Sequence, residues 1–370
     1  MKSNYNQLGQ YIEMVSRTNS DLKYGIEDVR GCSNTKQMMQ TRANLIGRTY
    51  EKFIVLRPQE FVFNRRTTRN GEKIGMAYNN TDREYIFTND YVAFRVKQEY
   101  LDKLLPDYLY MFFCRDEFDR YARYKSTGSA TEFFNWEDMC AVPFEIPPMD
   151  FQQLVVNAYK VLNERIETKQ KINDNLAEYL NCIYVELAKS VQETVPLSEV
   201  CGYVTDKSAF SEIETAVYIS TENILPDKQG VSSYGSTSAS ERVIHFREED
   251  VLVSNIRPYF KKMWFATTEG GCNADVLCFR ASDKKYSYLL KSILFQDGFF
   301  DYVMSGAKGT KMPRGDKNHI MQYPIPCFSD QQLQKFNALA SSVEQNQALN
   351  RQEMASLETA KGMLLTTLSR

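Results

Sequence analysis

The sequence predicts a mixed α/β (α+β) protein with two related β-rich units, each followed by a long helix. Short phrases recur in the same order in both halves of the 370-residue chain, which indicates an internal repeat. Runs of β-branched and aromatic residues bounded by Gly, Asn and Asp dominate the front of each half. The back of each half has apolar residues spaced by three or four over about 40 residues without proline, as in a long helix.

The repeat extends over most of the chain. The matching phrases are LGQYIEMV (8–15) with LSEVCGYV (197–204), YGIEDV (24–29) with YISTENI (218–224), EFVFNRR (60–66) with DVLVSNIR (250–257), VAFRV (92–96) with VLCFRA (276–281), and IPPMDFQQL (146–154) with IPCFSDQQL (325–333). Each match is short, but their common order indicates two copies of one unit with a pseudo-two-fold relation.

Helices are predicted in the later part of each copy. Residues 106–124 and 286–304 are expected to be helical. The long helices are expected to begin after Pro147 and Pro326, because proline is excluded from a helix interior. Asp150 and Gln153 have the spacing of an N-terminal capping box, as do Ser329 and Gln332.

The two long helices are expected to pack on each other, since a single helix of about 40 residues, roughly 60 Å long, cannot bury its apolar stripe alone. Gln347 and Asn350 interrupt the stripe and would fix the register of the pair. In the alternative arrangement, each helix packs only on its own unit. The residues predicted to pair the helices or contact a subunit are Leu154, Leu162, Ile166, Leu176, Leu180, Val343, Met354, Leu357 and Leu364.

The predicted boundaries are 1–148 for the first unit, 149–192 for its helix, 196–327 for the second unit and 329–370 for its helix. Hydrophobic residues make up 43% and charged residues 25% of the chain, as in globular proteins. No apolar run reaches the length of a membrane span and the first residues do not resemble a signal peptide, so we expect no membrane association and a cytoplasmic location.

Catalytic and metal-binding motifs are missing from the sequence. It has no GxGxxG or GxxxxGK[ST] loop, and no [DN]PP[YF] motif of an amino-methyltransferase. Eight scattered cysteines without a CxxC pair and only two histidines argue against a zinc site and favour reduced thiols. We therefore expect no catalytic residue, no metal and no cofactor in this chain.

Basic residues gather in three segments with glycine or proline, at 64–73, 254–262 and 306–319, although the net charge is −2. Arginine pairs with guanine or phosphate and asparagine with adenine, so these segments are suited to contacting DNA. A solvated surface without a special role is the alternative. The candidate DNA-binding residues are Asn64, Arg65, Arg66, Arg69, Lys73, Asn255, Arg257, Lys261, Lys262, Lys308, Lys311, Arg314 and Lys317.

The ordered set of phrases resembles the specificity (S) subunit of type I restriction-modification enzymes. The resemblance covers essentially the whole chain and includes LGQYIEMV and PLSEVCGYV at the two unit starts. The resemblance also includes the segments STGSATEFFNWEDMCAVPFEIPPMDFQQ (126–153) and SGAKGTKMPRGDKNHIMQYPIPCFSDQQ (305–332). The stretch at 129–138 is much less basic than its counterpart at 310–317, so the two loops need not do the same work.

This resemblance implies that each unit is a target-recognition domain that reads one half of a bipartite double-stranded DNA sequence. It implies that the two helices pair as an antiparallel coiled coil, set the gap between the half-sites and hold two methyltransferase subunits. Those subunits use S-adenosylmethionine, and added motor-nuclease subunits use ATP with magnesium. Alternatives are the recognition subunit of a related restriction-modification or phage-defence system, a protein-only coiled-coil scaffold, and a methyltransferase or nuclease with diverged motifs.

Overall fold

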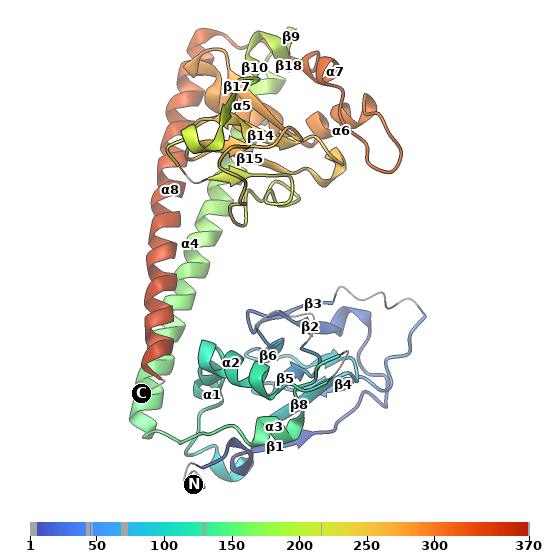
Figure 1. Ribbon diagram of the computed structural model, residues 1–370, viewed down its shortest axis with the longest axis vertical. Helices are drawn as coiled ribbons and strands as arrows, with labels where there is room; N and C mark the ends of the chain where they lie inside the picture. The colour runs from blue at the N-terminus through green and yellow to red at the C-terminus, as the bar shows by residue number, and fades with distance from the viewer. Residues whose placement is uncertain are drawn as a thin grey trace. The chain divides into compact units, whose positions relative to one another are not determined.

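The computed structural model divides into two compact units, each built from parts of both long helices (Figure 1). Unit 1 comprises Met1–Thr168 with Glu353–Arg370, and unit 2 comprises Lys169–Gln352. The structure describes residues 6–41, 45, 47–67, 73–128, 131–215 and 217–368. The predicted boundaries separate the helices from the units, whereas each compact unit includes a stretch of both helices.

Each unit contains an antiparallel four-stranded sheet of the same connectivity. In unit 1 the strand order is β1 (Ile12–Val15), β8 (Tyr91–Val96), β5 (Phe61–Asn64) and β6 (Met76–Tyr78). In unit 2 it is β10 (Cys201–Tyr203), β17 (Val276–Ala281), β14 (Val251–Ser254) and β15 (Met263–Phe265). Ile12 lies opposite Val96, as Cys201 lies opposite Ala281. The structure therefore confirms the internal repeat.

A smaller set of strands covers one face of each four-stranded sheet. In unit 1 these strands are β2 (Arg30–Cys32) with β3 (Met38–Gln40), and β4 (Ile54–Leu56) with β7 (Tyr85–Phe87). In unit 2 they are β11 (Lys207–Ala209), β13 (Arg242–Phe246), β16 (Gly270–Cys272) and β12 (Tyr218–Ile219), and a further pair joins β9 (Thr194–Pro196) to β18 (Pro324–Pro326).

The predicted match between 24–29 and 218–224 is wrong in register. Val29 pairs in parallel with Ile86, and Tyr218 pairs in parallel with Gly271 of the corresponding strand. Val29 rather than Tyr24 is therefore the structural counterpart of Tyr218. The shared tyrosine of the two phrases suggested a register that the strand pairing does not support.

Short helices cover the other face of each sheet. They are α1 (Pro106–Phe113), α2 (Asp116–Lys125) and α3 (Trp136–Cys140) in unit 1, and α5 (Ser287–Leu294), α6 (Asp297–Ser305) and α7 (Lys317–Met321) in unit 2. The helices expected at 106–124 and 286–304 are thus present, but each is divided in two. Pro106 and Ser287 start corresponding helices 181 residues apart (287 − 106 = 181), and Trp136 and Lys317 have the same offset.

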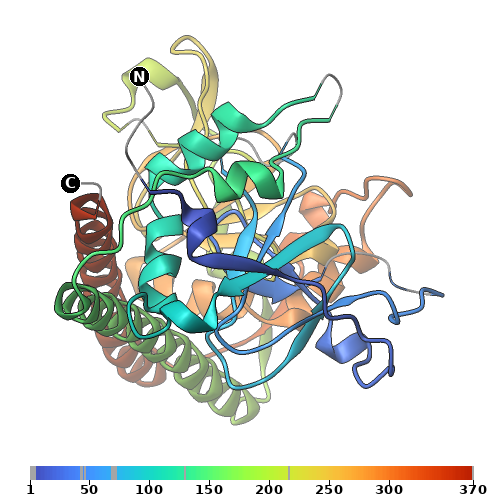
Figure 2. The same cartoon turned by 90° about the horizontal axis from the view of Figure 1, so that it is seen from below.

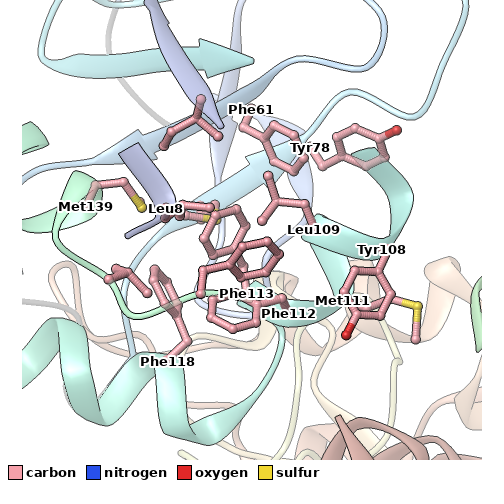
Figure 3. Packing of buried hydrophobic residues seen from close by; sticks show 14 of the residues in the cluster. Leu8, Phe61, Tyr78, Tyr108, Leu109, Met111, Phe112, Phe113, Phe118 and Met139 are labelled. Carbon is pink, nitrogen blue, oxygen red and sulfur yellow. The ribbon is translucent and has the colours of Figure 1, made fainter. Parts of the chain in front are cut away.

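The central strands β5 and β14 are buried on both faces, which explains their uninterrupted apolar sequence. Phe61 and Phe63 point into the core under the helices, whereas Val62 points into the core under the smaller strands. Figure 3 shows Phe61 with Leu109 and Phe113 of α1 in the first of these cores. Unit 2 has the same alternation along Val251, Leu252 and Val253.

The long helices are α4 (Met149–Lys189), with 41 residues, and α8 (Asp330–Thr367), with 38 residues, as the sequence predicted. The capping box at the start of α8 is present: the Gln332 backbone N–H donates to Ser329 Oγ (3.4 Å), and the Ser329 N–H donates to Gln332 Oε1 (2.9 Å).

The capping box predicted at Asp150 and Gln153 is wrong, because α4 begins at Met149 and Asp150 already lies inside the first turn. The buried Gln152 side chain anchors this helix start instead. Its amide donates to the carbonyls of Lys103 (2.7 Å) and Pro147 (2.8 Å), and its oxygen accepts from the Leu105 N–H (2.9 Å).

A shift of two residues explains the wrong cap. The repeated phrases at 146–154 and 325–333 are 179 residues apart (325 − 146 = 179), but the helix starts are 181 apart (330 − 149 = 181). At an offset of 181, the buried Gln152 corresponds to the buried Leu333. The literal repeat in the sequence is therefore not the structural repeat at this point.

Replacing Ser329 with alanine is expected to destabilise the first turn of α8 by about 1 kcal/mol, because the Gln332 amide loses its acceptor. Amide hydrogen exchange at residues 330–333 measures this as faster exchange. Ser342→Ala is the matched control, since Ser342 lies in the middle of the same helix and alanine is the better helix former there. Equal exchange in the two variants would contradict the role of the cap.

Within each unit, α4 and α8 run antiparallel and lie side by side (Figures 1 and 2). In unit 1 Lys361 lies over the Tyr159 ring (6.0 Å to the centroid) and the Arg165 Nε contacts Glu353 Oε1 (2.6 Å). In unit 2 Lys169 contacts Asn350, and Asn173, one turn later on α4, contacts Gln347, which lies earlier on α8. This order also shows that the helices are antiparallel.

A polar layer interrupts the helix pair in unit 2. The Gln347 amide donates to the Asn173 carbonyl oxygen (2.8 Å), and the Asn350 amide donates to Asn173 Oδ1 (2.8 Å). Asn173 and Gln347 are both 7% exposed. A one-turn slip would leave these groups buried without partners, so the layer favours one register.

The predicted pairing residues have mixed environments. Leu180 and Val343 are buried in the core of unit 2, with Leu176 at its edge, while Leu364 packs against the core of unit 1. Leu162, Ile166, Met354 and Leu357 are half-buried.

The expectation for Leu154 is corrected, because this side chain is 68% exposed. Gln152, Val155, Val156 and Tyr159 form the buried face at this end of α4. At 3.6 residues per turn, Leu154 lies on the opposite side of the helix. None of the helices within the described ranges has the length and apolar character needed to cross a bilayer.

Candidate nucleic-acid interface

In both units the first residues after the central strand lie against a hairpin that connects the second and third short helices. We call these the strand-end loop (65–73 in unit 1, 255–262 in unit 2) and the hairpin (126–135 and 307–316). Arg66 bridges to Phe133 in unit 1, and Ile256 bridges to Arg314 in unit 2. The basic clusters at 254–262 and 306–319, separate in sequence, are therefore brought together in unit 2.

The strand-end loop of unit 2 has an unusual backbone. A short 3₁₀ helix, Pro258–Phe260, is flanked by Arg257 and Lys261, both with φ of 50° in the left-handed region. Such a conformation costs on the order of 1 kcal/mol for a residue with a Cβ. Hydrogen bonds hold it in place: the Arg257 N–H donates to the Pro313 carbonyl (2.8 Å), and the Asp227 N–H donates to the Phe260 carbonyl (2.9 Å).

Each hairpin turns at a glycine in the left-handed region. Gly128 has φ of 147° and Gly309 has φ of 98°, and the two are 181 residues apart (309 − 128 = 181). A Cβ at Gly128 would lie 2.0 Å from the Thr131 carbonyl oxygen. Glycine is therefore required at this turn of the unit 1 hairpin.

The cations of unit 2 are positioned by nearby carboxylates. Lys261 Nζ lies 2.9 Å from Asp297 Oδ1, and Arg314 lies 3.0 Å from Asp275 Oδ1. These pairs are partly solvent-exposed, so they orient the cations more than they stabilise the fold.

The remaining basic residues of unit 2 have other environments. Lys308 pairs with Asp316 (2.6 Å), and Lys317 lies over the Tyr203 ring (5.7 Å to the centroid). Lys262 is half-buried and donates to the Thr221 carbonyl (2.7 Å), which leaves it less available than the exposed Lys311.

Asp316 anchors the end of the hairpin and has a lowered pKa. The ammonium of Lys308 and the backbone N–H groups of His319 and Asn318 lower the pKa of Asp316 to about 2. Since an ordinary aspartate has a pKa of about 3.9, this interaction is fully formed above about pH 4 and disappears only as the pH falls through about 2. NMR of the His319 amide should therefore show a midpoint near 2. Lys308→Ala should raise that midpoint, and a wild-type midpoint near 4 would contradict the assignment.

The described part of unit 1 has fewer candidate cations than unit 2: Arg65, Arg66 and Lys73. Arg65 donates to Asn135 Oδ1 (3.0 Å) and lies over the Phe133 ring (5.7 Å), while Arg66 lies 3.6 Å from Asp90. Asn64 is used locally, since its Oδ1 accepts from the Arg66 N–H (3.0 Å). The predicted contact Arg69 lies outside the described residues.

A carboxylate at the start of the second short helix recurs in both units. Asp116 is the first residue of α2 and lies 3.7 Å from Lys73 Nζ, and Asp297 is the first residue of α6 and contacts Lys261 and Lys228. Sequence reasoning missed these acids because they lie far from their partners along the chain. Their common position relative to a helix start was the only available signal.

At the strand-end loop of unit 2, two buried polar atoms have no hydrogen-bond partner within the described part of the chain. They are Asn255 Oδ1, on a side chain that is 9% exposed, and Arg257 Nε. An unpaired buried donor or acceptor is costly, so these atoms are chemically suited to an incoming polar ligand. Asparagine and arginine are also the residue types that read adenine and guanine.

The arrangement offers arginine, lysine and asparagine side chains suited to phosphates and base edges, on the strand-end loop of each unit and also on the hairpin of unit 2. Within the described ranges, no three His, Cys, Asp or Glu side chains gather as a metal site. The eight cysteines are free thiols.

Comparison with solved structures shows the fold. The type I restriction-modification S subunit from M. genitalium matches with a TM-score of 0.52 and 12% identity, covering 99% of this chain and 96% of that chain. The HsdS subunit from Thermoanaerobacter tengcongensis matches with a TM-score of 0.36 and 15% identity, covering 98% and 95%. A chain of a type I R-M system studied for complex assembly matches with a TM-score of 0.46 and 15% identity, covering 98% and 96%.

No protein-family model matches the sequence, and no curated protein does. The match to the M. genitalium S subunit, which covers nearly all of both chains, establishes that this chain has the fold of a type I S subunit.

Proposed function

We propose that this chain is the DNA-specificity subunit of a type I restriction-modification complex. The observation that carries the proposal is the recurrence of one loop-and-hairpin arrangement with basic side chains in both units of an S-subunit fold. Each unit reads one half of a bipartite double-stranded DNA target. Phosphate contacts set its position, and base contacts from residues such as Arg257 supply sequence information.

The paired helices α4 and α8 set the gap between the two half-sites and hold two methyltransferase subunits. Exposed apolar residues along these helices, including Leu154, Val161 and Leu349, support such a contact. The polar layer at Asn173 and Gln347 supports the role in spacing. Its hydrogen bonds form in one register only, so α4 and α8 do not slide along each other.

The chain is proposed to be non-catalytic. Methylation with S-adenosylmethionine belongs to the methyltransferase subunits, and cleavage with ATP and magnesium belongs to motor-nuclease subunits. The absence of a methyltransferase motif in the sequence supports this division of labour.

Co-expression with the methyltransferase subunit from the same genome, followed by mapping of methylated adenines, tests the proposal. We expect a bipartite motif that requires this chain, with one half that changes when residues 1–145 are exchanged for another recognition domain. A soluble complex that methylates no motif would contradict the proposal and favour the protein-only scaffold. Binding of labelled S-adenosylmethionine by the purified chain would favour the enzyme alternative.

A further inference from the structure

We propose that Tyr259 and Phe260, the aromatic pair of unit 2, insert between stacked bases of the DNA and so make the two units read their half-sites by different means. The proposal rests on the proposed function and adds a residue pair and a mode of readout to it.

The aromatic pair is exposed although it consists of two large apolar rings. Tyr259 is 47% and Phe260 is 40% exposed, and the ring centroids are 4.6 Å apart. The two residues occupy the tip of the strand-end loop between the left-handed Arg257 and Lys261. A strained backbone conformation that presents apolar rings to solvent indicates a use for those rings.

The loop is held at its start by the Arg257 N–H, which donates to the Pro313 carbonyl (2.8 Å), and at its end by three further contacts. The Asp227 and Lys228 N–H groups donate to the carbonyls of Phe260 and Lys261 (both 2.9 Å). Lys261 also pairs with Asp297, which lies at the start of α6. The rings are thus presented on a fixed support, which lowers the entropy lost on binding.

Basic residues adjoin the aromatic pair and indicate its partner, although Lys261 is also paired with Asp297. Arg257, Lys261 and Lys262 flank the rings in sequence, and the Arg257 N–H is bonded to the hairpin that carries Lys308 and Arg314. Cations around an apolar wedge match the phosphates around a base step, where Phe and other apolar side chains unstack and kink DNA.

Unit 1 has no equivalent pair. Its strand-end loop, RRTTRNGEK at 65–73, contains no aromatic residue. The half-site read by unit 2 should therefore depend on the deformability of one base step, whereas the half-site read by unit 1 should not.

The test uses the complex with methyltransferase and a duplex of the motif that the wild-type complex methylates. A fluorescent adenine analogue is placed in turn at steps of the unit 2 half-site, outside the methylated adenine, because methyltransferases flip that base themselves. The wild-type complex should raise the fluorescence at one step. Tyr259→Ala/Phe260→Ala should abolish this rise and weaken binding about tenfold or more.

Three further variants complete the test. Phe260→Leu retains an apolar wedge and should retain most of the fluorescence rise. Tyr234→Ala is the matched control, since Tyr234 is 53% exposed and lines a hollow with Lys291 and Gln347 to which no residue of 255–262 contributes. The single variant Tyr259→Ala, a smaller change, is measured if the double variant melts at a lower temperature.

Unchanged fluorescence and affinity in the double variant would overturn the proposal while the proposed function stands. Loss of the methyltransferase from the double variant would also overturn it, because the rings would then contact protein. Failure of the proposed function is distinguishable from both outcomes, since the wild-type complex would methylate no motif.

Discussion

Replacing Asp119 with alanine is expected to lower the free energy of unfolding of unit 1 by about 3–5 kcal/mol, because it leaves a buried ammonium without its counter-ion. Lys36 and Asp119 are 3% and 5% exposed. Lys36 Nζ contacts Asp119 Oδ1 and the Ile74 carbonyl (2.8 Å), and Asp119 also accepts from the Ile74 N–H (3.0 Å). The pair ties the loop before β3 to helix α2.

The pKa of Lys36 predicts how this effect varies with pH. Burial lowers the pKa of Lys36 more than the attraction of Asp119 raises it. A lysine with a lowered pKa binds fewer protons in the folded state, so stability rises with pH up to the ordinary lysine pKa of about 10.4. The loss of stability in Asp119→Ala should therefore shrink as the pH is raised toward that value.

Hydrogen exchange of unit 1 peptides in the full chain under increasing urea measures the change. Asp116→Ala is the matched control on the same helix, since its ion pair with Lys73 is exposed and its loss should cost at most about 1 kcal/mol. A Lys36→Met/Asp119→Leu variant should lose less stability than Asp119→Ala, because it removes both charges and costs only the hydrogen bonds to the Ile74 backbone. Equal effects of Asp119→Ala and Asp116→Ala would contradict the expected cost of an unpaired buried ammonium at Lys36.

The second large effect is expected on DNA binding. Replacing Lys308, Lys311, Arg314 and Lys317 with alanine should reduce the slope of log affinity against log salt by about one for each phosphate that is no longer neutralised. If all four side chains bind phosphates, the affinity of the wild type should fall roughly a hundredfold more than that of the variant between about 50 and about 200 mM salt.

Fluorescence anisotropy with the co-expressed complex at several salt concentrations measures this slope. The matched control removes four exposed cations from the long helices, at Lys171, Lys189, Lys335 and Arg351, and changes the net charge equally. An equal drop in slope for both variants would indicate a general charge effect and would contradict a specific role for the hairpin of unit 2.

The sequence predicted the architecture better than it predicted the start of α4 or the candidate nucleic-acid interface. Repeated phrases and apolar periodicity predicted two units and two long helices, because burial leaves a pattern in local sequence. The cap of α4 was predicted wrongly, because this helix start is anchored by the tertiary hydrogen bonding of Gln152 to Lys103 and Leu105, which no local motif records.

The candidate interface was only partly predictable. Basic residues identified the loops. The sequence did not show that segments 254–262 and 306–319 lie together, because the bridge between Ile256 and Arg314 joins residues that are far apart in sequence. The exposure of the aromatic pair was not predicted, since composition does not reveal that Arg257 and Lys261 on either side of it adopt the left-handed conformation.

The division of the helices between the units has a consequence for synthesis on the ribosome. Unit 2 is one continuous stretch of chain, but unit 1 needs residues 353–368, whose Leu364, Leu365 and Leu368 pack against its core. At about 5–20 residues per second, that segment follows roughly 10–40 s after the rest of unit 1. The half that is translated first is therefore completed last, and until then the nascent chain exposes an apolar surface that chaperones can bind.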